Sequence, residues 1–490
     1  MKKLKYYLPL LLTIGLLVSC EKSLEELNID PNNPAKVSVQ LALPAGTVSV
    51  AGITGGRFAV IGGIWSQFYT QNNASNQYKD IDAFYYTPSD FAATWQEMYA
   101  GGLNDLQYVR REASKTGDWN FYLIATTMQV YAFQNFTDVF GDIPFSEALR
   151  GDQGISEPVY ETSQAIYDSL ITRLDVALSK DFTASTNTNA GPADFVFGGD
   201  MEKWIHFANT LKLKIYLRYA EVNPSKAQAG IAALNTSGVE FLSEDAALAV
   251  FEDAASKSNP FFEQDKRTLN TTQNLKASRT LFDLLDQSGD QRKFEIYNAA
   301  EAGGYKAMNQ GDFNAPTTVL APLTISTAKV DALDPVYLIS EAESYFLQAE
   351  AVERGWGTGD AEALYEMGVT ASFEQTGYGD DAADLLAGEY SFDTYFGGGL
   401  AAILMQKWIA FAGTQQGMEA FFDRMRTGYP EESPVYHSDP AYEPGLVVYP
   451  KEGTTQGQFA RRLFLPDTET SRNPNAPSQA NLWDPMWWHK

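Results

Sequence analysis

Apolar residues recur every three to four positions along most of this chain, a spacing that places them on one face of an α-helix. The pattern predicts helices over 92–109, 119–136, 163–178, 204–220, 278–285, 336–353, 361–373 and 403–411. Strict alternation of apolar and polar residues, which is typical of a half-buried strand, is sparse. We therefore expect a mostly α fold.

One pair of predicted helices forms a hairpin. The segment 355–359, Gly-Trp-Gly-Thr-Gly, interrupts the periodicity, and Asp360 is a good cap for the helix that follows. In that helix Ala361, Tyr365 and Gly368 have the small–aromatic–small spacing of the second helix of a tetratricopeptide unit. Small residues at these positions let two helices approach closely. No regular repeat of about 34 residues runs along the chain, so an ordinary helical hairpin is the alternative.

Long irregular segments separate the helices. They are rich in Gly, Asn, Thr, Pro and Asp, and they cover 179–200, 254–275, 300–334, 376–400 and 427–460. Long ordered loops in a compact domain usually carry function. A helical scaffold with such loops is typical of a binding protein.

The first 20 residues have the features of a lipoprotein signal. Lys2, Lys3 and Lys5 precede an apolar run, Leu8 to Val18, that is shorter than the roughly 18–20 residues a membrane span needs. The run ends just before Cys20, the one cysteine among the 490 residues. We predict a signal peptide over 1–19, lipid attachment at Cys20, a tether over 20–40 and a single domain over 41–490. An ordinary signal peptide with a coincidental cysteine is the alternative.

Composition excludes several classes of protein. A net charge of −26 argues against nucleic-acid binding, which needs clustered Lys and Arg. A hydrophobic content of 44% with 13% aromatic residues is too high for a disordered chain. Without a second cysteine the chain has no disulfide framework and no cysteine-based zinc site, so stability must come from packing.

Enzymatic motifs are scarce. His206 lacks a second histidine four residues away, which a zinc protease motif requires, so we expect it in the core or between helices. His437 and His489 are distant in sequence, and no nucleophile elbow or phosphate loop is present. We expect no enzyme activity, no cofactor and no metal site. Carboxylates are abundant, so a secreted glycoside hydrolase remains an alternative, although nothing selects two of them.

The segment 64–95 is the best candidate for ligand contact because it interleaves aromatic residues with amides. Sugars have apolar C–H faces and hydroxyl edges, so a sugar site needs flat rings beside groups that donate and accept hydrogen bonds. We predict ligand contact by Trp65, Tyr69, Asn72, Tyr78 and Tyr85, with stacking on an exposed platform. Trp95 and Tyr99, four residues apart on one helix face, are expected in the core.

Loop residues are weaker candidates for ligand contact. Among them we predict Arg267 and Tyr305, followed by Asn259 and Phe313.

Several motifs, in order along the chain, resemble the SusD/RagB family of outer-membrane lipoproteins, specifically its SusD-like branch. They are Asn-Ile-Asp-Pro-Asn-Asn-Pro at 28–34, Thr-Asp-Val-Phe-Gly-Asp-Ile-Pro-Phe-Ser-Glu-Ala at 137–148, Trp-Ile-His-Phe-Ala-Asn-Thr-Leu-Lys-Leu-Lys at 204–214 and Arg-Arg-Leu-Phe-Leu-Pro at 461–466. Within the second motif, Asp138 and Asp142 are expected to satisfy backbone N–H groups of a turn.

The resemblance implies a helical fold built on tetratricopeptide-like hairpins with long irregular loops. It also implies a lipid-anchored protein of the outer membrane that faces the cell exterior and covers a SusC-type TonB-dependent transporter. Such a protein binds oligosaccharide, or in some members peptide, ahead of import. The aromatic and amide content slightly favours a glycan, and the sequence does not identify which one.

The lipid anchor can be tested with Cys20→Ala. The variant should fold normally and be released from membranes, because only the anchor is lost. Membrane fractionation and metabolic labelling with a radiolabelled fatty acid measure this. A variant that still incorporates the fatty acid would refute the proposed attachment site.

Overall fold

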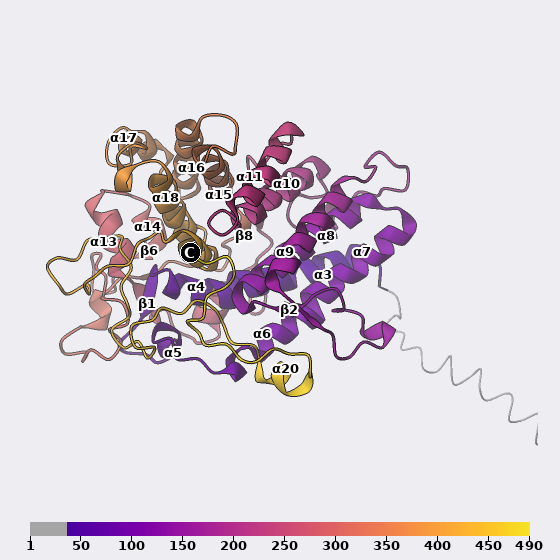
Figure 1. The fold of residues 1–490 in the computed structure, drawn as a ribbon. Coiled ribbons are helices and arrows are strands. Elements are labelled where there is room, and N and C mark those ends of the chain that lie inside the picture. Colours follow the sequence, from indigo (N-terminus) through magenta and orange to yellow (C-terminus); the bar gives the residue numbers. More distant parts are fainter. Residues whose placement is uncertain (1–36) are drawn as a thin grey trace, which may run out of the picture.

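The computed structural model describes residues 37–490, in which helices predominate (Figure 1). The α-helices are α3 (Val39–Gly52), α4 (Phe58–Trp65), α5 (Lys79–Asp82), α6 (Ala92–Gln96), α7 (Asn104–Thr116), α8 (Trp119–Phe140), α9 (Ser163–Leu178), α10 (Met201–Leu217), α11 (Pro224–Thr236), α12 (Pro260–Phe262), α13 (Arg279–Gln287), α14 (Lys293–Ile296), α15 (Glu341–Glu353), α16 (Ala361–Gln375), α17 (Ala382–Leu386), α18 (Leu400–Gly413), α19 (Gly417–Thr427) and α20 (Asp467–Arg472). The π-helical segments are η1 (Ile53–Arg57), η3 (Glu97–Leu103) and η6 (Glu263–Arg267). Short 3-10 turns are η2 (Pro88–Phe91), η4 (Gly151–Gln153), η5 (Gly191–Ala193), η7 (Pro322–Thr324), η8 (Gly379–Asp381) and η9 (Tyr395–Gly397). The expected mostly α fold is confirmed.

The first helical segment of the described chain was not predicted from the pattern. α3, η1 and α4 form one rod of 27 residues, Val39–Trp65, which is long and apolar enough to cross a membrane by length and composition alone. However, 72% of its most apolar window is buried inside the fold, so it serves as a core helix. At Gly62 a Cβ atom would lie 1.9 Å from the backbone nitrogen of Met418, so only glycine permits this crossing of α4 and α19.

Consecutive helices pack as hairpins, among them α7 with α8, α8 with α9, α10 with α11, and α15 with α16. In the last pair Tyr365 is fully buried, and a Cβ atom at Gly368 would lie 2.8 Å from the ring of Phe346. Glycine is therefore needed where the two helices meet. The predicted close approach of this hairpin is confirmed.

The helix predicted over 336–353 is in part a strand. Val336–Ile339 forms β8, which pairs antiparallel with β4 (Ala246–Leu248), and α15 begins only after Ser340. The Ser340 side chain accepts a hydrogen bond from the N–H of Glu343, which caps the helix there. The run Val-Tyr-Leu-Ile at 336–339 is rich in strand-forming residues, and the partner strand β4 decides its conformation.

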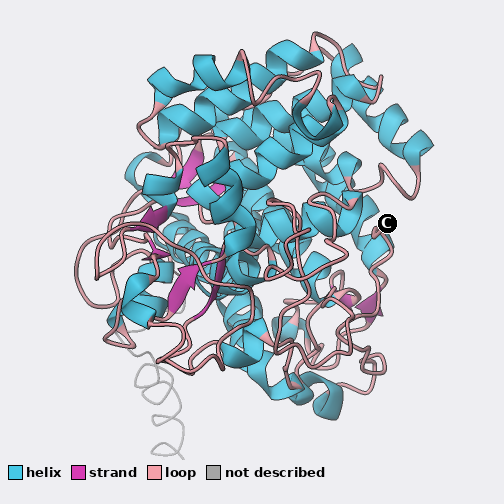
Figure 2. Ribbon diagram, turned by 90° about the vertical axis from the view of Figure 1, so that its left-hand side faces the viewer, coloured by secondary structure: helices cyan, strands magenta, loops and turns pink. Residues whose placement is uncertain are grey.

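The other strands are short, and all the strand pairs are antiparallel. β1 (Tyr69–Gln71), β5 (Leu275–Ala277), β7 (Thr327–Ala328) and β6 (Tyr297–Asn298) form a sheet in that order, with Thr70 opposite Lys276. β2 (Ile143–Pro144) pairs with β3 (Tyr160–Glu161). Figure 2 shows most of the strands gathered on one side of the helices, among the long loops.

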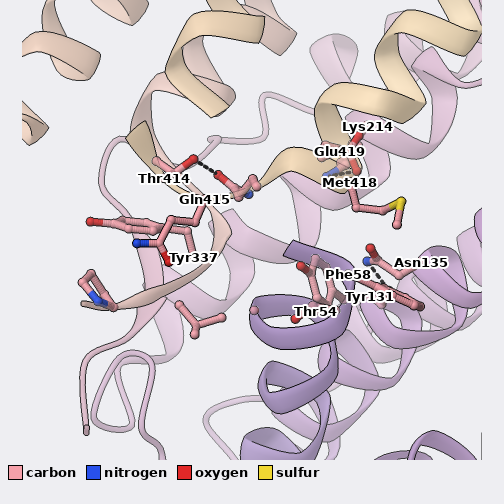
Figure 3. Close-up of a pocket in the computed structure, with 14 residues that line it drawn as sticks. Thr54, Phe58, Tyr131, Asn135, Lys214, Tyr337, Thr414, Gln415, Met418 and Glu419 are labelled. Carbon is pink, nitrogen blue, oxygen red and sulfur yellow. Dashed lines mark hydrogen bonds and ion pairs between the residues drawn. The ribbon is translucent and has the colours of Figure 1, made fainter. Parts of the chain in front are cut away.

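Within residues 37–490, nine buried charged side chains form one network between five helices. They are Asp138 on α8, Lys214 and Arg218 at the end of α10, Glu343 and Glu350 on α15, Lys407 on α18, and Glu419, Asp423 and Arg426 on α19. Lys214 Nζ lies 2.8 Å from Glu343 and 2.9 Å from Glu419. Figure 3 shows Lys214 and Glu419 beside a cavity of about 30 Å³, which has room for about one water molecule.

The expected turn role of Asp138 is wrong. Its carboxylate lies at the end of α8, where it pairs with Arg218 at 3.2 Å and accepts a hydrogen bond from the Tyr167 hydroxyl at 2.5 Å. Burial outweighs the attraction of Arg218 and raises the pKa of Asp138 to about 6. Asp142 does bind backbone, since its carboxylate accepts from the N–H of Ser163 at 2.8 Å.

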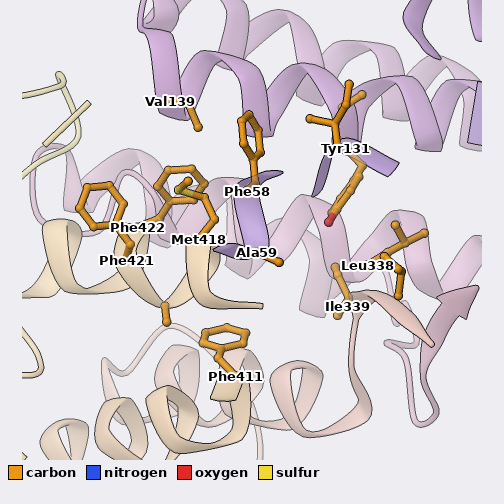
Figure 4. Packing of buried hydrophobic residues seen from close by; sticks show 14 of the residues in the cluster. Phe58, Ala59, Tyr131, Val139, Leu338, Ile339, Phe411, Met418, Phe421 and Phe422 are labelled. Carbon is orange, nitrogen blue, oxygen red and sulfur yellow. The ribbon is translucent and has the colours of Figure 1, made fainter. Parts of the chain in front are cut away.

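The core joins α4 to α19 through aromatic rings. Trp65 is 3% exposed, its Nε1 donates to the carbonyl of Ile81 at 3.1 Å, and its ring centroid lies 5.0 Å from that of Phe421. Figure 4 shows Phe421 and Met418 of α19 in the same apolar layer as Phe58 of α4. Trp65 is therefore a core residue of this layer.

Breaking the charge network at Glu350 should destabilise the protein. Its carboxylate binds Arg426 at 2.5 and 2.8 Å, and Glu350→Gln leaves that buried guanidinium with Asp423, at 2.9 Å, as its remaining counter-charge. We expect the free energy of unfolding at pH 7 to fall by about 3 to 5 kcal/mol. Urea unfolding measures this, with exposed Glu353→Gln on the same helix as the control.

The pH dependence of that loss has a defined sign. Burial opposes ionisation of Glu350, but Arg426 and Arg354 outweigh it and lower the pKa of Glu350 from 4.5 to about 2. A carboxyl with a lowered pKa contributes stability above its unfolded value, and the contribution is lost as the pH falls toward the folded value. The difference between the parent chain and Glu350→Gln should therefore shrink below about pH 5. A constant difference from pH 7 to pH 3.5 would contradict this.

Core packing also predicts the result of truncating Trp65. Trp65→Ala should lower the free energy of unfolding by about 3 to 5 kcal/mol. Tyr85→Ala, whose parent side chain is 59% exposed, should change it by less than about 0.5 kcal/mol. Denaturant unfolding compares the two variants, and equal midpoints would contradict the assignment of Trp65 to the core.

Candidate functional site

Three of the aromatic residues predicted as a stacking platform lie inside the molecule. Trp65, Tyr69 and Tyr78 are 3%, 1% and 1% exposed. The expectation of a solvent-exposed platform is wrong for these residues, because the segment that carries them starts in core helix α4 and continues into the sheet. The ring of Tyr69, for example, packs against Phe261 and Tyr297 with centroids 6.1 Å away.

The side chain of Asn72 is also buried, and it forms hydrogen bonds within the protein. Its amide donates to the carbonyl of Gln273 at 2.7 Å and its side-chain oxygen accepts from the N–H of Ala74 at 3.1 Å. At 2% exposure it has no free edge on the surface. It joins the end of β1 to the start of β5.

The remaining predicted residues differ in exposure, from fully buried Asn259 to exposed Tyr85 and Tyr305. Tyr85 is 59% and Tyr305 is 40% exposed. Arg267 is partly buried, pairs with Asp253 and Glu263, and lies 5.2 Å from the ring centroid of Phe262. Asn259 caps α12, and Phe313 is buried. Cys20 lies outside the described residues.

Tyr305 stands at a groove of about 490 Å³, within the range of small-ligand sites of about 300 to 1,000 Å³. The groove lies between α13 and the loop after β6. It is lined by Arg279, Phe282, Asp283, Tyr305, Lys306, Ala307, Met308, Asn309, Asp312, Ala315, Val319 and Leu320. The lining thus combines an exposed aromatic ring with a guanidinium, an amide, an ammonium and two carboxylates.

Arg279 connects the walls of the groove. Its guanidinium donates to Asp283 at 2.7 Å, to Asn309 at 3.2 Å and to the backbone carbonyl of His437 at 2.7 Å. Its backbone N–H donates to the carbonyl of Met308 at 3.0 Å. These hydrogen bonds therefore fix the distance between helix α13 and residues 305–309.

His437 does not line the groove, but as a neutral residue it binds segments next to the lining. Its Nδ1 accepts from the backbone N–H of Gln310 at 3.0 Å, and its Nε2 lies 2.9 Å from the Thr280 hydroxyl. Burial, with a smaller effect of Arg279, lowers the pKa of His437 to about 3. The ring remains uncharged at neutral pH and holds the turn at 310–312 in place.

The loop that closes the groove is shaped by the amide-rich segment. The Asn73 amide donates to the carbonyls of Ala315 and Leu320, both at 2.9 Å. Gly311 has φ +71°, and a Cβ atom there would lie 2.7 Å from the backbone nitrogen of Lys451. Asn73, from the segment 64–95, thus positions the loop of the groove, while other residues line the groove.

The two carboxylates of the groove have cationic partners. Asp283 binds Arg279, and Lys451 Nζ lies 2.7 Å from Asp312. Burial raises the pKa of Asp283, and Arg279 partly opposes this. The groove therefore presents mixed charge, with donors and acceptors side by side.

A second groove, of about 690 Å³, lies between α6, the start of α7 and α20. Trp95 and Tyr99 line it, but Trp95 is 5% exposed and its ring packs against Phe140 and Phe136 at 5.3 and 5.8 Å. The expected core position of Trp95 is confirmed. Tyr99, which was also expected in the core, is only partly buried, and its hydroxyl donates to the carbonyl of Pro144 at 2.8 Å.

The pattern of the sequence did not single out Arg279, Asp283, Asn309 or Asp312. The run Asn-Gln-Gly-Asp at 309–312 could have indicated Asn309 and Asp312. These residue types are typical of turns, and the run lies inside a loop that was predicted to be functional. Arg279 and Asp283 are charged residues on a predicted helix, where a solvated face is the ordinary outcome.

Comparison with known proteins identifies a family and several solved structures that this chain resembles. Residues 63–444 match the family SusD-like_2, described as "Starch-binding associating with outer membrane". No curated protein sequence matches the chain.

Among solved structures, a SusD homologue from Bacteroides uniformis is 23% identical, with a TM-score of 0.73 over 92% of this chain and 99% of that one. A chitin-binding SusD homologue from Flavobacterium johnsoniae is 21% identical, with a TM-score of 0.72 over 91% and 98%. A SusD homologue from Bacteroides fragilis is 18% identical, with a TM-score of 0.72 over 93% and 100%. At these identities the likeness concerns the fold, while the family match covers most of the chain, and the protein belongs to the SusD-like family of outer-membrane-associated proteins.

Proposed function

We propose that this protein captures oligosaccharide at the cell surface and delivers it to a SusC-type TonB-dependent transporter. The family description, starch binding in association with the outer membrane, supports glycan binding. A structural neighbour is named as chitin-binding. Acylation at Cys20 would hold the protein at the outer membrane, facing the exterior.

The observation that carries the proposal is the groove at Tyr305. Its 40% exposed ring can cover the C–H face of a sugar, and Arg279, Asn309 and Asp283 supply donors and acceptors for the hydroxyl edge. The polar groups are held by one another and by His437, so little ordering is needed on binding.

The charges of the groove favour a neutral glycan. Arg279 and Lys306 stand beside Asp283 and Asp312, so the local charge is mixed. The net charge of the chain is −26, which repels acidic sugars at long range. Neutral glucan and chitin oligosaccharides are therefore the ligands to test first.

We infer that the groove binds glycan without cleaving it. A glycoside hydrolase needs two opposed carboxyls, one that protonates the leaving group and one that acts as a base or nucleophile. Here Asp283 is bound by Arg279 and Asp312 by Lys451. Extended peptides use the same kinds of groups, so a peptide ligand is the runner-up.

Replacement of Tyr305 tests the groove. Tyr305→Ala should weaken oligosaccharide binding by about 1 to 3 kcal/mol because a stacking ring is lost. Because the ring is partly exposed and packs only edge-on against Phe294, the melting temperature should change little. Titration calorimetry with malto- and chito-oligosaccharides, together with an unstructured peptide library and an assay for released sugars, measures affinity and turnover.

Two variants control for location. Tyr85→Ala removes an exposed tyrosine that does not line the groove, and Gln96→Ala changes the second groove near α6. Neither should alter affinity. If Gln96→Ala weakens binding and Tyr305→Ala does not, the site at Tyr305 is wrong. Released sugars would contradict the inference of binding without cleavage.

A further inference from the structure

Three side chains with metal-ligating atoms meet at the start of α10. Glu202 and His206 are four residues apart, one helical turn, and so lie on the same face. Glu240 joins them from the segment between α11 and β4. One ligand atom from each lies within 4.8 Å of the others, and His206 Nε2 is 3.2 Å from Glu240 Oε2.

The separation of these atoms fits a transition-metal site. Zn²⁺ binds imidazole nitrogen and carboxylate oxygen at about 2.0 to 2.2 Å in tetrahedral geometry, so two ligand atoms lie about 3.3 to 3.5 Å apart. The distance between His206 and Glu240 is close to this value. Glu202 is exposed, so a change of its rotamer can bring its carboxylate to the same point.

The backbone around Glu240 is fixed to the helix that carries the other two side chains. The amide of Asn209, on α10, donates to the carbonyl of Glu240 at 3.2 Å. The hydroxyl of Thr210, also on α10, accepts from the N–H of Leu242 at 2.9 Å. The relative position of Glu240 and His206 is thus set by the fold.

Nearby cations do not neutralise the two carboxylates. Lys203 Nζ pairs with Glu244 at 2.7 Å. Within residues 37–490, no lysine or arginine forms an ion pair with Glu202 or Glu240, and the ionic partner of Glu240 is His206. Two carboxylates beside one imidazole therefore form a site of negative charge that suits a divalent cation.

We propose that Glu202, His206 and Glu240 bind a divalent transition metal of the Zn²⁺ class. The imidazole ligand favours Zn²⁺ over Ca²⁺ and Mg²⁺, which prefer oxygen ligands only. Three protein ligands leave one coordination position open to water or to a donor from another molecule. The sequence predicted no metal site because no second histidine lies four residues from His206. In the structure the carboxylates of Glu202 and Glu240 lie beside His206 instead.

The site is distinct from the glycan groove. Figure 1 shows α10 and α13 well apart in the molecule. The proposal therefore does not rest on the proposed function, and glycan titration has no bearing on it.

Zinc titration of the full chain carrying Cys20→Ala tests the site, since this change removes the single thiol. His437 and His489 are buried, at 2% and 8% exposure, so background binding should be low. We expect saturable binding of one Zn²⁺ by calorimetry and a higher melting temperature with ZnCl₂. His206→Gln and Glu240→Gln should each weaken binding by more than tenfold, since even loss of a supporting partner costs about 10- to 100-fold.

Glu244→Gln is the matched control, because it removes a neighbouring carboxylate that pairs with Lys203 and leaves the three ligands intact. Its Zn²⁺ affinity should equal that of the parent chain. Melting curves without metal show whether each variant is folded. Absence of saturable Zn²⁺ binding by the folded parent chain would overturn the proposal and leave an ordinary His–Glu ion pair. Equal affinity of the parent and of folded Glu240→Gln would overturn it as well.

Discussion

Five helices of this fold meet at charges that cannot be left unpaired. Taking a charged group out of water costs several kcal/mol, so each member of the network needs its partners in place. Asp138 on α8 pairs with Arg218 at the end of α10. Lys214 on α10 pairs with Glu343 on α15 and Glu419 on α19, and Glu350 on α15 pairs with Arg426 on α19. Such a network adds little net stability compared with a well-packed apolar core, but loss of one member is costly. Its main effect is to specify how α8, α10, α15, α18 and α19 are placed.

The irregular half of the molecule depends on that frame. The groove at Tyr305 is built from a short helix, a turn and a loop, with few strand hydrogen bonds, and single polar side chains hold these parts together. Arg279, His437 and Asn73 each bind backbone of a segment distant in sequence. Loops positioned by a rigid scaffold are a common way to place binding groups. The helices therefore provide the frame on which the loops of the groove are positioned.

Composition identified side chains that are able to contact a sugar, but it did not show which of them are accessible. The segment 64–95 does combine aromatic rings and amides, but Trp65 and Tyr69 fill the core and Asn72 and Asn73 bind backbone. Packing and ligand stacking use the same side chains, so residue type alone does not separate them. Tyr305 was predicted because it lies in a loop, and the structure places it at the groove. Glu240 lies next to His206 only because the chain folds back toward α10 after α11, which the sequence does not show.

The sequence by itself determined the features that depend on near neighbours. The helix over 163–178 has the predicted bounds, and the hairpin of α15 and α16 closes at Gly368 as its spacing indicated, because helical periodicity and capping act within one or two turns. The family motifs are likewise short segments. Only the tertiary structure decided that Val336–Ile339 is a strand, that Trp65 is buried and that Asp138 pairs with Arg218. Each of these depends on a partner far along the chain, such as β4 for the strand and Phe421 for Trp65. The local sequence does not specify which distant residue will pack there.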